Sequence, residues 1–117
     1  MNHNKFNKTF GKTCDDIYKL VGEKENYDKN DAEIMLKGAP EIILRNYKID
    51  INRYNAFENK ILSLSVKYAE KLSVTMGFEG SILAMTFGIL EGTGIIGING
   101  GQKLLLQATL NGGLKLE

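Results

Sequence analysis

The segment Gly92-Thr93-Gly94-Ile95-Ile96-Gly97 has the glycine spacing of dinucleotide-binding loops, Gly-x-Gly-x-x-Gly. Glycines in such loops let the backbone approach a pyrophosphate at the N-terminus of a helix. The pattern also requires a preceding strand, a following helix and an acidic residue about 20 positions further on. Glu117 alone stands at that distance, so we interpret the segment as a glycine-rich turn or a site of close packing.

A backbone site for a nucleotide or another small anion, formed at a subunit boundary, is an alternative interpretation of this segment. Successive backbone amides can form a concave nest that binds an anion. The residues that would form this site are Gly92, Thr93, Gly94, Gly97, Asn99 and Gly100.

The other reactive side chains form no catalytic or metal-binding pattern. An oxygen-rich cluster begins at Asp28, but a calcium loop needs glycine at its sixth position and glutamate at its twelfth. The chain has Glu33 and Ala39 there. Cys14 has only His3 as a candidate base, and a nucleophilic thiol needs an activating base nearby. We therefore expect no metal site, no cofactor and no enzymatic activity.

Two carboxylates, Glu79 and Glu91, stand in an otherwise uncharged apolar stretch. Paired buried carboxylates can perform acid–base chemistry. Because burying an ionised carboxylate is costly, we expect each of them to reach solvent or a basic partner. The five tyrosines are spread along the chain without clustered basic residues, so we assign them to packing rather than to base stacking.

The overall charge excludes strong electrostatic steering. The chain has 15 basic and 14 acidic side chains, a formal net charge of +1, so neither nucleic acid nor an anionic membrane is an expected partner. One cysteine cannot form a disulfide within its own chain, and the polar first ten residues do not resemble a secretory signal. We expect a cytoplasmic protein. Its richness in Asn, Lys and Ile indicates a bacterial or mobile-element origin.

The first half of the chain predicts a flexible arm over residues 1–12, followed by a single globular domain over 13–117. A first helix should begin near Thr13 and end at Gly22, and a second should begin after Asp28 or Asn30 and stop at Gly38. Pro40 suits the first turn of a third short helix that ends at Tyr47.

The clearest element is a long central helix over residues 51–76, capped by Asp50 and ended by Gly77. Apolar residues recur along it at steps of three and four, which places them on one face. A stripe of this length suits the spine of a bundle or an oligomer seam. The residues expected at an oligomer interface are Tyr54, Phe57, Ile61, Leu64, Tyr68, Leu72 and Phe87.

The last third is rich in glycine and poor in charge. Residues 81–91 predict a buried helix that begins at Ser81, and the segment from Gln102 to Leu110 favours a final helix. Asn99-Gly100 and Asn111-Gly112 also suit hairpin turns, so a C-terminal β-hairpin or meander is the alternative. The stretch 80–98 is long enough to span a bilayer, and Gly88 and Gly92 have small-xxx-small spacing, but Glu91 and the glycines argue against insertion.

These features predict a mainly α fold, a compact helical bundle around the 51–76 helix with a glycine-rich C-terminal region, or α+β in the hairpin alternative. The expected function is that of a small non-enzymatic, homo-oligomeric binding or inhibitor module that occupies an unidentified partner protein stoichiometrically. A chain of this size buries only about two-thirds of its surface on its own, and self-association would cover the apolar remainder. The small-anion binder and a membrane-associated protein are the alternatives.

Overall fold

The computed structural model describes residues 3–22, 26 and 28–110 of the 117-residue chain. These residues form α1 (His3–Val21), α2 (Lys29–Tyr47), α3 (Ile51–Ala56), α4 (Glu58–Gly92) and α5 (Gly100–Leu110), with no strand among them. The predicted mainly α fold is confirmed. The hairpin alternative is wrong for residues 100–110, which are helical, and residues 111–117 lie outside the described part of the chain.

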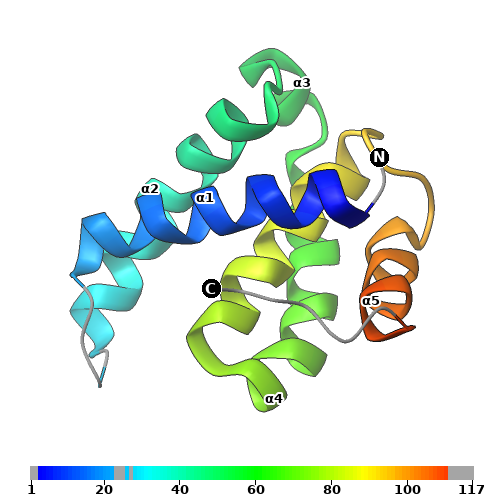
Figure 1. Cartoon of the computed structure of the whole chain (residues 1–117). Coiled ribbons are helices and arrows are strands. Elements are labelled where there is room, and N and C mark those ends of the chain that lie inside the picture. Colours follow the sequence, from blue (N-terminus) through cyan, green and yellow to red (C-terminus); the bar gives the residue numbers. More distant parts are fainter. Residues whose placement is uncertain (1–2, 23–25, 27, 111–117) are drawn as a thin grey trace.

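The bundle is organised around α4, which turns back on itself at Gly77. The backbone there has φ 62° and ψ −132°, a conformation that interrupts the helix and that glycine adopts without steric cost. Figure 1 shows the two halves of α4, in green and yellow, side by side, with α1 crossing them and α5 standing next to them. Gly77 therefore divides α4 into a helical hairpin with a first arm over residues 58–76 and a second arm over residues 78–92. The first arm ends where the sequence predicted, and the predicted 81–91 helix lies within the second arm.

Small residues on the second arm allow the two arms to lie very close together. A Cβ atom added at Gly80 would lie 2.6 Å from the carbonyl carbon of Leu72, and one at Gly92 would lie 3.1 Å from the Cα of Ile61. One added at Gly88 would lie 2.9 Å from the backbone nitrogen of Ser65. Gly80, Gly88 and Gly92 thus serve helix packing, whereas Gly94 and Gly97 of the glycine-rich segment are exposed in the connection after α4.

The predicted start of the first helix differs from the structure. Residues 3–12 belong to α1 and are not a flexible arm, because Phe6 and Phe10 are each only 1% exposed. Phe6 stacks on Phe87 of α4 with ring centroids 5.2 Å apart. Thr13 is therefore not a cap: it lies inside α1, where its hydroxyl donates to the carbonyl of Thr9 at 2.8 Å.

The helix α2 continues through Gly38 and Pro40, where the sequence predicted a stop and a restart. Proline in a helix leaves the carbonyl four residues earlier without its partner, but Ala39, Ile42 and Ile43 are buried and hold the segment in place. A Cβ atom at Gly38 would meet the side chain of Leu20, so this glycine permits close packing of α1 on α2.

The predicted single helix over 51–76 is interrupted at Phe57, whose φ of −117° and ψ of 21° separate α3 from α4. Two of the predicted N-cap residues are confirmed, whereas Ser81 lies inside α4 and caps no helix. Asp28 caps α2 in a reciprocal capping box with Asp31, and Asp50 caps α3 by accepting from the backbone N–H of Asn52 at 3.0 Å. Gly22, with φ 76°, follows the end of α1 as predicted.

Candidate functional site

An apolar groove lies between α2 and α4. It encloses about 480 Å³. One wall comes from α2, the opposite wall from the first arm of α4, and the floor largely from the second arm. The residues that make up the walls and floor are Ala32, Leu36 and Pro40 (α2), Leu62, Val66 and Ala69 (first arm), and Ser81, Ala84, Met85 and Ile89 (second arm).

Large aliphatic side chains stand exposed along both walls. Leu36 is 58% exposed, Leu62 63% and Val66 52%. Leu62 and Val66 are four residues apart and therefore lie on one face of α4, where they form a continuous ridge. We call these two residues the α4 ridge. A contiguous exposed apolar surface beside a hollow marks an interaction site more often than scattered exposed residues do.

The polar groups in the groove are few and lie at its end near α3 and along its floor. Tyr54 and Glu58 line the α3 end, and Ser65 and Ser81 contribute hydroxyl groups. Burial, with a smaller contribution from the Glu58 carboxylate, raises the pKa of Tyr54 above its ordinary value, so this phenol is neutral at pH 7. An aliphatic groove with neutral hydroxyl groups and one carboxylate suits an apolar occupant.

The structure divides the predicted anion-binding residues between the end of α4, the connection to α5 and the start of α5. Gly92 lies inside α4 against Ile61, and the Thr93 hydroxyl donates to the carbonyl of Ile89 at 2.7 Å. Gly94, Gly97 and Asn99 are exposed in the connection to α5. A Cβ atom at Gly100 would lie 2.9 Å from the side chain of Ile96. Of these residues, Gly92 is therefore packed against the first arm of α4, whereas Gly94, Gly97 and Asn99 lie at the surface.

A carboxylate of the protein itself occupies the N-terminus of α5. Glu91 is 8% exposed, accepts a hydrogen bond from the Tyr68 hydroxyl and accepts another from the backbone N–H of Gly101 at 3.1 Å. The prediction that Glu91 reaches solvent or a basic partner is therefore wrong. A negative charge is stabilised at a helix N-terminus, so Glu91 fixes α5 to the end of α4.

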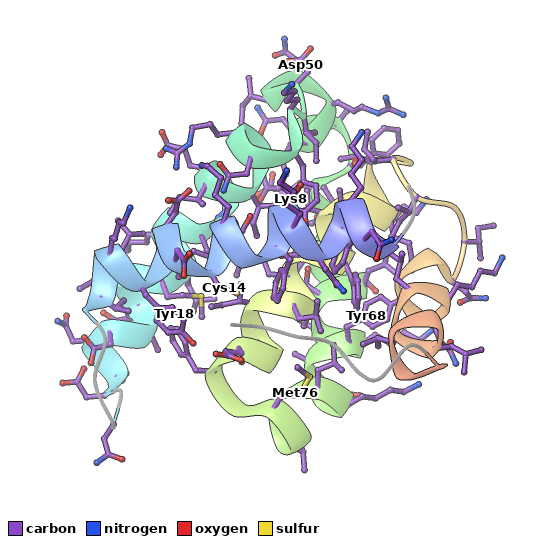
Figure 2. The ribbon with its side chains drawn as sticks, in the orientation of Figure 1. Lys8, Cys14, Tyr18, Asp50, Tyr68 and Met76 are labelled. Atoms are coloured by element: carbon purple, nitrogen blue, oxygen red, sulfur yellow. The ribbon has the colours of Figure 1, made fainter. Side chains whose placement is uncertain are left out.

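Burial and the Glu91 carboxylate raise the pKa of Tyr68 well above its ordinary value, with burial the larger cause. Figure 2 shows Tyr68 directed from α4 towards α5. Glu79 binds a different tyrosine: the Tyr18 hydroxyl donates to it at 3.0 Å. The two carboxylates therefore have separate hydrogen-bond partners.

The predicted oligomer interface lies mostly on a buried face. Ile61, Tyr68, Leu72 and Phe87 are each at most 8% exposed, and their apolar surface packs within the chain. Tyr54 and Leu64 are half-buried, and Phe57 is 44% exposed. The exposed apolar face of α4 is instead the neighbouring one, which carries the α4 ridge.

A signal in the sequence could have identified which face of α4 is buried. Gly80, Ala84, Gly88 and Gly92 recur every fourth residue, so small residues form one stripe on the second arm. Such a stripe indicates a helix packed closely against it, and the first arm supplies that helix through Ile61 and Leu72.

The Cys14 thiol is buried in the core. Cys14 is 1% exposed, and burial, with smaller contributions from Glu79 and Asp15, raises the pKa of its thiol to about 12. Figure 2 places Cys14 on the side of α1 that faces the bundle. Among the described residues, no group of three or more His, Cys, Asp and Glu side chains is placed to hold a metal ion.

Comparison with known proteins identifies no relative: the chain matches no protein-family model, no curated protein and no solved structure. Within residues 3–22, 26 and 28–110, none of the helices combines the length and apolar character needed to cross a membrane.

Proposed function

We propose that this protein is a non-enzymatic binding module that holds the apolar face of a partner protein's helix in the groove between α2 and α4. By occupying the partner stoichiometrically, it would act as an inhibitor or adaptor. The observation that carries the proposal is the exposure of Leu36, Leu62 and Val66 on the two walls of one apolar hollow.

The dimensions of the groove support a helix as the occupant. The α4 wall extends from Glu58 to Ala69, which is roughly 16 Å at about 1.5 Å per residue. That length matches about three turns of a bound helix. Amphipathic helices bind in such grooves through apolar residues at i, i+3, i+4 and i+7.

The exposed side chains on the walls would contribute to the free energy of binding. Burying a large aliphatic side chain that was fully exposed contributes about 1.5–3 kcal/mol. Leu36, Leu62 and Val66 are each more than half exposed, so the three together offer a few kcal/mol, to which the partner adds its own apolar surface. Ordering and association offset part of this gain.

A synthetic amphipathic helix tests the proposal. The probe is a peptide of about 18 residues with leucine at i, i+3, i+4 and i+7, long enough to form helix, and the comparison is a peptide of the same composition in scrambled order. We expect saturable binding of one amphipathic peptide per chain, measured by calorimetry. Val66→Glu should weaken binding at least roughly tenfold, a loss of about 1.4 kcal/mol.

Val74→Glu is the matched control, because Val74 is on the same arm of α4, is 83% exposed and does not line the groove. It should leave the peptide affinity within about twofold, since distant surface substitutions have small effects. Equal binding of the scrambled peptide, or equal loss in both variants, would refute a helix-binding groove.

A further inference from the structure

We propose that the hollow between the first arm of α4 and α5 binds a small phosphate monoester, which Lys67 and Lys71 attract by its charge. The hollow encloses about 220 Å³ and shares none of its described lining residues with the groove between α2 and α4. This inference therefore goes beyond the proposed function and does not depend on it. The described residues that line the hollow are Lys67, Tyr68, Lys71 and Leu72 of α4, Asn99 directly before α5, and Gln102 and Leu105 of α5.

The two lysines bring positive charge to one place. They are four residues apart on α4, so they lie on the same side of the helix, and both line the hollow and are exposed to solvent. The described part of its lining includes no acidic residue. The groove, by contrast, has Glu58, and the hollow beside Pro40 has Glu41 together with its basic residues. The lining next to α5 therefore has a positive potential that favours an anion.

The acidic residues nearest to this hollow lie outside its lining. Glu70 is exposed on α4, and Glu91 is buried and accepts a hydrogen bond from the Tyr68 hydroxyl. The ion pairs between residues that the structure describes all involve Asp16, so neither glutamate is paired with Lys67. Because electrostatic attraction weakens with distance, a ligand in the hollow experiences the two ammonium groups more strongly than these carboxylates.

Side-chain amides add neutral donors to the lysines. Asn99 and Gln102 line the hollow from the α5 side, and each has an NH₂ group that can donate two hydrogen bonds. Backbone N–H groups at the start of α5 are already used: that of Gly101 donates to Glu91 at 3.1 Å, and that of Lys103 donates to the carbonyl of Asn99 at 3.0 Å. The side chains, rather than the end of the helix, would therefore hold the ligand.

The composition of the lining suits a phosphate that carries an apolar group. A phosphate monoester has a charge of about −1.5 to −2 at pH 7 and several acceptor oxygens, which matches two ammonium groups, and lysine binds phosphate as a point charge. Tyr68, Leu72 and Leu105 form the apolar part of the lining. Pockets for drug-sized ligands have volumes of about 300–1,000 Å³, so a hollow of about 220 Å³ suits a smaller molecule.

Titration with phenyl phosphate tests the proposal, with phenol as the uncharged comparison. The isotope-labelled full chain is titrated into the millimolar range of the ligand, and backbone amide shifts are followed by NMR. We expect saturable shifts at residues 67–72 and 99–105, with the amides of α2 unchanged. Raising the salt concentration from about 20 mM to about 200 mM should weaken binding several-fold, because salt screens exposed charges. Shifts that do not saturate, or equal binding of phenol, would overturn the proposal.

Substitutions at one lysine separate a built site from general attraction to a basic surface. Lys67→Gln should weaken phenyl phosphate binding by about fivefold, whereas Lys67→Arg, which keeps the charge, should stay within about twofold. Lys60→Gln is the matched control, because Lys60 is exposed on the same arm and lines neither this hollow nor the groove. It should leave the affinity within about twofold. Equal loss in Lys67→Gln and Lys60→Gln would show that net charge alone attracts the ligand and would overturn the site.

Discussion

At the scale of single residues, the absence of side chains at three positions of α4 decides how the molecule folds. An added Cβ atom would collide with backbone atoms of the first arm at Gly80 and Gly88, and with the Ile61 side chain at Gly92. Glycine inside a helix normally costs about 0.5–1 kcal/mol relative to alanine. The close packing that glycine allows between the two arms offsets this cost.

We therefore expect Gly88→Ala to destabilise the protein, although the same change stabilises most helices. The new methyl group would collide with Ser65, and overpacking of this kind costs about 1–3 kcal/mol. Thermal unfolding followed by circular dichroism measures the effect. Gly11→Ala is the matched control, because Gly11 is inside α1 and has no atom within 4 Å of an added Cβ. It should be neutral or raise stability by up to about 1 kcal/mol, and an equal response of both variants would contradict this account.

At the scale of elements, the position of α5 depends on one buried carboxylate. Glu91, at the end of α4, accepts from the backbone N–H of Gly101, in the first turn of α5, and from the Tyr68 hydroxyl. A Cβ atom at Gly101 would lie 2.7 Å from the ring of Phe87 and 2.8 Å from the Tyr68 oxygen. The Glu91 carboxylate and Gly101 together hold α5 against Tyr68 and Phe87 of the hairpin.

Replacing Glu91 by alanine should therefore release α5 more than it destabilises the rest of the molecule. The change leaves two buried donors without a partner, and each unsatisfied group costs about 1–3 kcal/mol. Hydrogen exchange should become faster at the amides of residues 100–106 while α1 and α2 keep most of their protection. Glu70→Ala, on an exposed position of α4, should leave exchange in α5 unchanged. Wild-type exchange in the Glu91→Ala variant would show that the carboxylate does not anchor α5.

The local signals of the elements were predictable from sequence, and the contacts between elements were not. Asp28, Asp50 and Gly22 act through hydrogen bonds and dihedral angles within a few residues, so the sequence alone identifies them. Gly38 and Pro40 suggested a helix end because their intrinsic preferences oppose helix, but packing against α1 overrides those preferences.

The groove escaped prediction for a related reason. The first arm of α4 has two adjacent apolar stripes, one with Ile61, Tyr68 and Leu72 and the other with Leu62 and Val66. Periodicity shows that both exist but does not show which one another helix covers. That choice depends on the second arm of the hairpin, whose glycine stripe packs on the first of them and leaves the α4 ridge exposed.

At the scale of the whole molecule, three weakly acidic side chains from three different helices are buried in or against the core in their uncharged forms. The Cys14 thiol of α1 and the phenols of Tyr47 in α2 and Tyr68 in α4 lie in apolar surroundings. Burial is the largest cause that raises the pKa of each: that of Cys14 reaches about 12, and those of Tyr47 and Tyr68 also rise well above their ordinary values. Folding therefore holds all three groups in their protonated, uncharged forms.

This arrangement predicts that stability falls in alkaline solution. Below about pH 9 the folded and unfolded chains keep the same protons on these groups, so the full stability is present. As pH rises past the ordinary pKa of 9.0 for the thiol and 10.0 for the phenols, the unfolded chain loses protons that the folded chain retains. Because the unfolded state then binds fewer protons, the free energy of unfolding decreases with pH.

Each group contributes a decrease of about 1.4 kcal/mol per pH unit until its folded-state pKa is reached. The urea midpoint measured between pH 8 and pH 11 should therefore stay level up to about pH 9 and then decline with increasing slope. Cys14→Ala lowers stability at every pH but removes the thiol's share, so its decline should begin nearer the phenol pKa of 10.0. A midpoint that stays constant to pH 11 would mean that these groups ionise inside the folded protein, and the helices could not then be held together by a core that keeps them neutral.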